Sequence, residues 1–112
     1  MNNREIAIKM GEILSAKQAE EIIILGIAEQ SSFADFFVNA TALNERQLAA
    51  LADEVEGRMA KDGVVPKNIE GRPPSGWVLM DFGDIIVHIF NEESRAFYDL
   101  ERTWRDAQVI TL

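Results

Sequence analysis

The spacing of apolar residues alternates along this chain between the period of a helix and the period of a strand. Helical spacing predicts an amphipathic helix over roughly residues 4–16, and a second one that begins after the N-cap Asn44 and ends at Gly63. Two runs between these helices, residues 22–28 and 33–41, are rich in β-branched or aromatic residues and predict neighbouring strands. The first run is apolar on both faces, which is typical of a strand covered by helices on both sides.

The most informative pattern is a pair of apolar strands folded back around the sequence Asp-Phe-Gly-Asp at residues 81–84. Because side chains alternate across a strand, this hairpin has two unlike faces. One face is uniformly apolar and is predicted to be core; it consists of Val78, Met80, Ile85, Val87 and Ile89. The other face carries two carboxylates, an indole and the single histidine of the chain; it consists of Trp77, Leu79, Asp81, Asp84, Ile86 and His88. We expect function on this second face.

A third helix is predicted after the hairpin, starting near residue 93. Phe97, Leu100 and Trp104 share one of its faces and are predicted to be core. Tyr98 and Glu101 lie off this apolar stripe or at its edge, so they are candidates to extend the binding face of the hairpin.

The order of the predicted elements is helix, strand, strand, helix, strand, strand, helix. This order predicts an α/β fold, a layered domain with a mixed β-sheet flanked by helices. Residues 64–76 hold all three prolines and are predicted to form a loop or a semi-rigid arm. At 112 residues the chain is expected to form one domain, residues 1–112.

Composition narrows the possible functions. The chain has no cysteine, which excludes a disulfide framework and thiolate catalysis. Its formal net charge of −8 argues against direct binding to a nucleic-acid backbone and suits a basic protein surface. Acidity that serves only solubility is an alternative that charge alone does not separate. The longest apolar run is too short to span a bilayer, so we expect no membrane association and a cytoplasmic location.

Several motifs occur together in the order of a known family. They are Ser-Ser-Phe-Ala-Asp-Phe-Phe-Val at residues 31–38, the hairpin at residues 77–90, and Phe-Tyr-x-Leu-Glu-x-x-Trp at residues 97–104. From about residue 5 to residue 107 the chain resembles the ribosomal silencing factor family, also called the Iojap family. The resemblance implies a translation repressor that binds the large ribosomal subunit through its ribosomal protein number fourteen and blocks association with the small subunit. It also implies a nucleotidyltransferase-like fold without the catalytic residues, and a possible homodimer.

The hairpin face and the resemblance select one set of candidate partner-binding residues: Trp77, Leu79, Asp81, Asp84, His88, Tyr98 and Glu101. The indole is expected to be the apolar anchor, because tryptophan is enriched in interface hot spots. The three carboxylates are expected to pair with Lys or Arg of the partner, and the other side chains to shape the contact. A structural alternative stays open, in which the two Asp residues favour the turn and the indole caps the edge of the core.

The same residues allow an enzymatic alternative. Two Asp and one His could hold a divalent cation for phosphoryl chemistry, as in a nucleotidyltransferase-related enzyme or a nucleotide-binding protein. The chain contains no Gly-rich phosphate loop to accompany them. We therefore predict no catalytic residue, no metal and no cofactor, and keep this as the second hypothesis.

Overall fold

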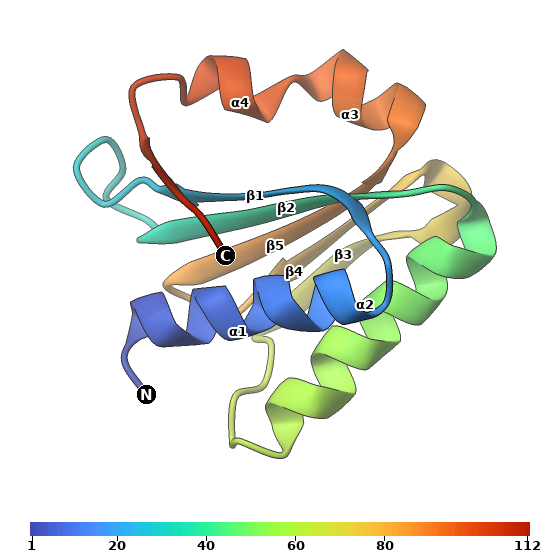
Figure 1. Ribbon diagram of the computed structural model, residues 1–112, viewed down its shortest axis with the longest axis horizontal. Coiled ribbons are helices and arrows are strands. Elements are labelled where there is room, and N and C mark those ends of the chain that lie inside the picture. The colour runs from blue at the N-terminus through green and yellow to red at the C-terminus, as the bar shows by residue number, and fades with distance from the viewer.

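The computed structural model describes residues 1–112 and is built around a mixed sheet of six strands (Figure 1). Its elements follow the chain in the order α1 (Asn3–Ala16), β1 (Glu20–Gly26), β2 (Phe36–Ala42), α2 (Glu45–Ala60), β3 (Asn68–Arg72), a 3₁₀ turn (Pro73–Ser75), β4 (Trp77–Asp81), β5 (Ile85–Asn91), α3 (Glu92–Tyr98), α4 (Leu100–Thr103) and β6 (Gln108–Ile110). The strands lie in the order β3-β4-β5-β2-β1-β6. Only β2 and β5 pair in parallel, and every other neighbouring pair is antiparallel. The predicted α/β fold with a mixed sheet is confirmed.

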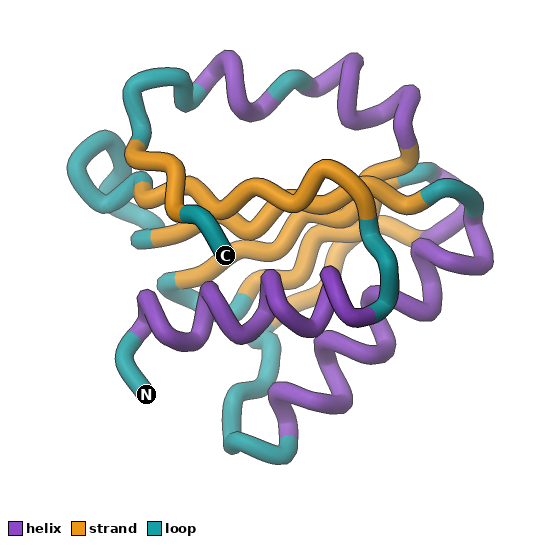
Figure 2. The backbone as a smooth tube through the Cα atoms, viewed as in Figure 1, coloured by secondary structure: helices purple, strands orange, loops and turns teal.

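Helices cover both faces of this sheet. α1 and α2 pack on one face and α3 and α4 lie over the other, so the sheet is one layer between two helical layers (Figure 2). The first face holds the main core, in which the apolar sides of α1 and α2 meet the inward side chains of the strands. The five hairpin residues predicted to be core are each at most 3% exposed. None of the helices has the length and apolar character needed to cross a lipid bilayer.

Asparagine side chains cap the N-termini of the two longer helices, α1 and α2. The Asn2 side chain accepts a hydrogen bond from the Glu5 backbone N–H at 2.8 Å, and the Asn2 backbone N–H donates one to the Glu5 carboxylate at 3.1 Å. Asn44 caps α2 as predicted, accepting from the Gln47 N–H at 2.8 Å. The predicted end of α2 lies too far along, because the helix stops at Ala60 and Gly63 adopts its positive φ in the turn that follows.

The structure corrects the prediction of one continuous helix after the hairpin. Asp99 adopts a left-handed conformation, with φ 46° and ψ 54°, and divides the segment into α3 and α4. A left-handed residue changes the direction of the chain, so residues before and after it no longer share one helical face. Phe97 is consequently 80% exposed, and its prediction as a core residue is wrong. Trp104 is half-buried and packs against Phe37, with ring centroids 5.4 Å apart.

Two strands were not predicted. β3 lies inside the stretch expected to be a loop, and all five of its residues are exposed at the edge of the sheet. β6 has only three residues and pairs with β1 at the other edge. Strand prediction depends on alternation of apolar and polar residues. β3 lacks this alternation because an exposed edge strand does not need it, and β6 is too short, with three residues, to show it.

Candidate functional site

Four aromatic rings are stacked on the sheet face that α3 and α4 cover. Trp77 pairs across the hairpin with Phe90, and the two rings lie 5.6 Å apart at 17°. Tyr98 of α3 lies 4.6 Å from the indole and 6.2 Å from Phe90, and the ring of His88 is nearly parallel to Phe90, at 5.7 Å and 5°. Phe90 is buried, Trp77 is half-buried and Tyr98 is exposed, so the stack leads from the core to the surface.

His88 is a buried member of this stack, with 5% of its surface exposed. Its Nδ1 accepts a hydrogen bond from the indole Nε1–H of Trp77 at 3.2 Å. Burial lowers the pKa of His88 from 6.5 to about 4, because desolvation disfavours the charged imidazolium. The side chain is therefore neutral near pH 7. Its buried ring has no direct access to a partner, so its influence on a contact passes through Trp77.

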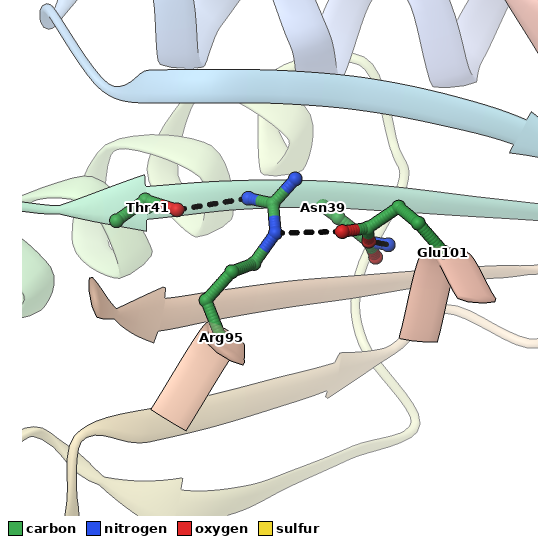
Figure 3. Close-up of polar contacts among 4 residues, drawn as sticks. All are labelled: Asn39, Thr41, Arg95 and Glu101. Carbon is green, nitrogen blue, oxygen red and sulfur yellow. Dashed lines mark hydrogen bonds and ion pairs between the residues drawn. The ribbon is translucent and has the colours of Figure 1, made fainter. Parts of the chain in front are cut away.

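A polar cluster lies beside the aromatic stack, because Asn39 and Thr41 of β2 are the register partners of His88 and Phe90. Figure 3 shows this cluster. The guanidinium of Arg95, a residue only 7% exposed, donates from Nε to Glu101 Oε1 at 3.0 Å and from Nη1 to Thr41 Oγ1 at 2.9 Å. The second oxygen of Glu101 accepts from Asn39 Nδ2 at 2.6 Å. These bonds join α3 and α4 to β2, across 54 and 62 residues of sequence. The carboxylate of Glu101, which we expected to face a partner's cation, thus already has two donors within the chain.

The two carboxylates of the hairpin turn lie away from the stack. Asp81 accepts from the Gly83 backbone N–H at 2.7 Å, and Asp84 accepts from the Asn3 side chain at 3.1 Å. The residues Asp81 and Trp77 stand at opposite ends of β4, four residues and about 13 Å apart. Asp84 is exposed at the same end as Asp81. Of the predicted site residues, the structure brings together Trp77, Leu79, His88, Tyr98 and Glu101, and holds the two Asp residues apart from them.

Phe97 is a candidate contact residue that sequence reasoning missed. Its ring lies 5.1 Å from that of Tyr98 in an edge-to-face arrangement, and it adds apolar surface next to the stack. Leu79 is half-buried and borders a shallow hollow with Glu70, Gly71 and the indole. The only signal for Phe97 in the sequence was its place beside Tyr98, and an unbroken helical pattern assigned it to the core.

The composition of this surface is that of a contact between macromolecules. Tryptophan, tyrosine and phenylalanine are enriched in the cores of protein–protein interfaces, where charged residues are depleted. No group of three or more His, Asp or Glu side chains is arranged to hold a metal ion. The fold and the site together describe an α/β domain that presents an aromatic surface next to its third helix.

Comparisons with known proteins agree on one family. Residues 1–112 match the family model described as ribosomal silencing factor during starvation, so this chain belongs to the ribosomal silencing factor family. A ribosomal silencing factor of Halalkalibacterium halodurans is 35% identical over 112 residues, which is all of this chain and 96% of that protein. The Zymomonas mobilis silencing factor is 47% identical over 92 residues, 81% of this chain and 68% of that one.

A solved structure and a plant relative support the same family. A crystal structure from Chromobacterium violaceum superimposes with a TM-score of 0.88 at 33% identity, and covers 93% of this chain and 87% of its own. The chain is also 31% identical to the chloroplastic Iojap protein of Zea mays, over 95% of this chain and 46% of that protein. The family resemblance drawn from the sequence is confirmed.

Proposed function

We propose that this protein represses translation by binding the large ribosomal subunit through its ribosomal protein number fourteen, which prevents association with the small subunit. Membership of the silencing factor family supports the ribosome as the target. The proposed action needs only occupancy of a surface, because a bound protein excludes the other subunit by its volume. It requires no chemical step from the side chains of the site.

The observation that carries the proposal is the half-buried indole of Trp77 within an aromatic surface. A side chain that is already packed on one side exposes a fixed apolar edge, and such a residue is suited to be the centre of an interface. Leu79 and the exposed rings of Tyr98 and Phe97 widen that apolar area. The net charge of −8 favours encounter with a basic partner, since opposite potentials raise association rates.

In this proposal the candidate residues have different parts. Trp77, Leu79 and Tyr98 form the central contact. Asp81 and Asp84 form an acidic rim about 13 Å away, where pairing with Lys or Arg adds to the rate of association more than to affinity. The carboxylate of Glu101 and the ring of His88 support the aromatic surface from beneath.

Co-sedimentation with isolated large and small ribosomal subunits tests the proposal. The wild-type protein should pellet with the large subunit alone, and it should reduce the yield of joined ribosomes when both subunits are present. Trp77→Ala should weaken binding by about 2–4 kcal/mol, or roughly 30- to 1,000-fold, because truncating a central tryptophan removes most of a hot spot. Circular dichroism checks that the variant is folded.

Two matched variants separate the centre of the surface from other exposed groups. Val109→Ala removes exposed apolar surface on β6, at the far edge of the sheet, and should bind as the wild type does. Asp84→Lys should slow association and reduce its dependence on salt, whereas Glu12→Lys, the same change of charge on the outer face of α1, should do so much less. Normal binding by folded Trp77→Ala would refute the proposed surface.

The family resemblance also predicted a homodimer, and this stays a separate prediction. Light scattering coupled to size-exclusion chromatography measures the mass in solution and compares it with the 12.6 kDa of one chain. A dimer that Trp77→Ala dissociates would show that the aromatic surface is shared between self-association and the ribosome.

A further inference from the structure

The hydrogen bond beneath the aromatic surface gives His88 a role of its own. We propose that His88 is the positioning residue of this surface, and that its Nδ1 holds the Trp77 indole in the orientation in which a partner meets it. This inference rests on the proposed function, because it concerns the same surface, and it assigns a task to a residue that no partner touches.

The chemistry of the two rings fixes the direction of the bond. The indole nitrogen of tryptophan is a donor only, so Nδ1 of His88 must be the unprotonated, accepting nitrogen. The proton of the neutral imidazole is therefore on Nε2. Burial, which lowers the pKa of His88 to about 4, keeps the ring in this neutral form at the pH of the cell. A charged imidazolium would have protons on both nitrogens and could not accept from the indole.

Packing holds the acceptor in one place. The ring of His88 lies between Phe37, 4.9 Å away and nearly perpendicular, and Phe90, 5.7 Å away and parallel. The indole of Trp77 lies 5.9 Å from it at 22°. A ring enclosed in this way keeps its rotamer, so an acceptor on it is a fixed point for the more exposed indole.

Asn39 completes the second layer under the surface. It is the register partner of His88 on the neighbouring parallel strand, so the two side chains lie next to each other on the same face. Nε2–H of His88 is a donor without a partner, and Oδ1 of Asn39 is an acceptor without one. The amide of Asn39 is in turn oriented by the hydrogen bond that its Nδ2 donates to Glu101 of α4. The imidazole of His88, the amide of Asn39 and the carboxylate of Glu101 thus follow one another beneath the aromatic surface.

A partner that meets a fixed indole need not order it on binding. Immobilising one side chain that is otherwise free weakens binding by a factor of about 2 to 12. Loss of the His88 acceptor should therefore weaken binding of the large subunit by about tenfold at most, well short of the loss of the indole itself. This intermediate effect is the signature expected of a positioning residue rather than a contact residue.

Three substitutions at one position test the acceptor. In His88→Asn the side-chain oxygen can occupy the place of Nδ1, whereas His88→Gln carries its polar group further out, near the place of Nε2. His88→Leu has no acceptor. The indole N–H resonance of Trp77 in ¹⁵N-labelled protein reports the bond directly, and that of Trp104, the other tryptophan, is the internal control. We expect the bonded shift and slow hydrogen exchange in the wild type and His88→Asn, and their loss in His88→Gln and His88→Leu.

Affinity for the large subunit should follow the same order, with His88→Asn binding more tightly than His88→Gln and His88→Leu. The leucine change should have no effect on affinity in a Trp77→Phe background, because phenylalanine has no N–H to position. Melting curves identify any variant that is not folded at the assay temperature. If His88→Leu is not folded, the comparison of His88→Asn with His88→Gln still tests the acceptor, because both side chains are polar.

The outcomes separate this inference from the function on which it rests. If folded Trp77→Ala binds normally, the proposed surface is wrong, whatever His88 does. If Trp77→Ala loses binding while His88→Leu keeps both wild-type affinity and the wild-type indole resonance, His88 does not position the indole. Loss of affinity in His88→Asn, with its indole bond intact, would also overturn the inference, because it would show that the imidazole acts by some property other than its acceptor.

Discussion

Acidification from pH 7.5 to pH 5 should destabilise this protein through one side chain. His88 has a pKa of about 4 in the folded protein and 6.5 as its ordinary value, because burial opposes its charged form. Between these values the unfolded chain binds a proton that the folded chain does not. The contribution of His88 to stability is therefore fully present above pH 6.5, and it is lost as the pH falls from 6.5 towards 4.

The magnitude follows from the two pKa values. Each unit of difference corresponds to about 1.36 kcal/mol, so the full loss below pH 4 is about 3 kcal/mol. By pH 5 the linkage relation gives a loss of about 2 kcal/mol. A domain of this kind has a total stability on the order of 5–15 kcal/mol, so this loss is large enough to be measured.

Urea unfolding at several values between pH 7.5 and pH 5, followed by circular dichroism, provides the assay. His88 is the only histidine in the chain, and the matched variant is His88→Leu, which has nothing to titrate at this position. That variant starts from a different stability, but its free energy of unfolding should change much less over the same range. Equal pH dependence in the two proteins would refute the reasoning, since it would assign the effect to groups other than His88.

Two further substitutions, Gly71→Ala and Glu101→Leu, test the supports of the aromatic surface, and each is compared with a control variant. Gly71→Ala should destabilise the protein by about 1–3 kcal/mol or more, because Gly71 has φ +82° and an added Cβ would lie 2.2 Å from the Trp77 carbonyl oxygen; a lower melting temperature measures this. Gly57→Ala in α2, where a Cβ meets nothing within 4 Å, should instead stabilise by about 0.5–1 kcal/mol. Glu101→Leu should cost about 3 kcal/mol in urea unfolding, since it leaves the buried guanidinium of Arg95 without its carboxylate. The double variant Arg95→Leu/Glu101→Leu should recover part of that loss, and a purely additive result would contradict the coupling.

Much of the fold could be predicted from the sequence because it is recorded in local periodicity. The hairpin was recovered with both of its faces, since a short turn fixes the register and alternation then assigns every side chain. Asn44 marked the start of α2 for an equally local reason. The end of the chain was harder, because the left-handed Asp99 is one backbone conformation that hydropathy does not record. That single residue turned Phe97 from a core residue into an exposed one.

The site shows a different limit of sequence reasoning. The alternation of apolar and polar residues predicts which side chains share a face of the hairpin, but it does not predict how far apart these side chains lie along the strand. Trp77 and Asp81 share a face and are nevertheless at opposite ends of β4. The polar cluster was beyond reach for another reason, since Glu101 finds its partners on β2 and α3 only after the sheet has formed. Local patterns predict elements and faces, whereas the partners of a polar side chain depend on tertiary structure.

The arrangement of buried polar groups under the aromatic surface has a physical logic. A buried histidine and a buried arginine contribute little net stability, because desolvation offsets much of what their bonds return. Apolar residues of similar size would serve the core at least as well. Polar groups, however, fix direction as well as contact: Nδ1 of His88 orients the indole of Trp77, and Arg95 ties α3, which carries Tyr98, to β2. We therefore interpret the second layer as a device for rigidity in the exposed one, where an ordered tryptophan and tyrosine lower the entropy lost when a partner binds.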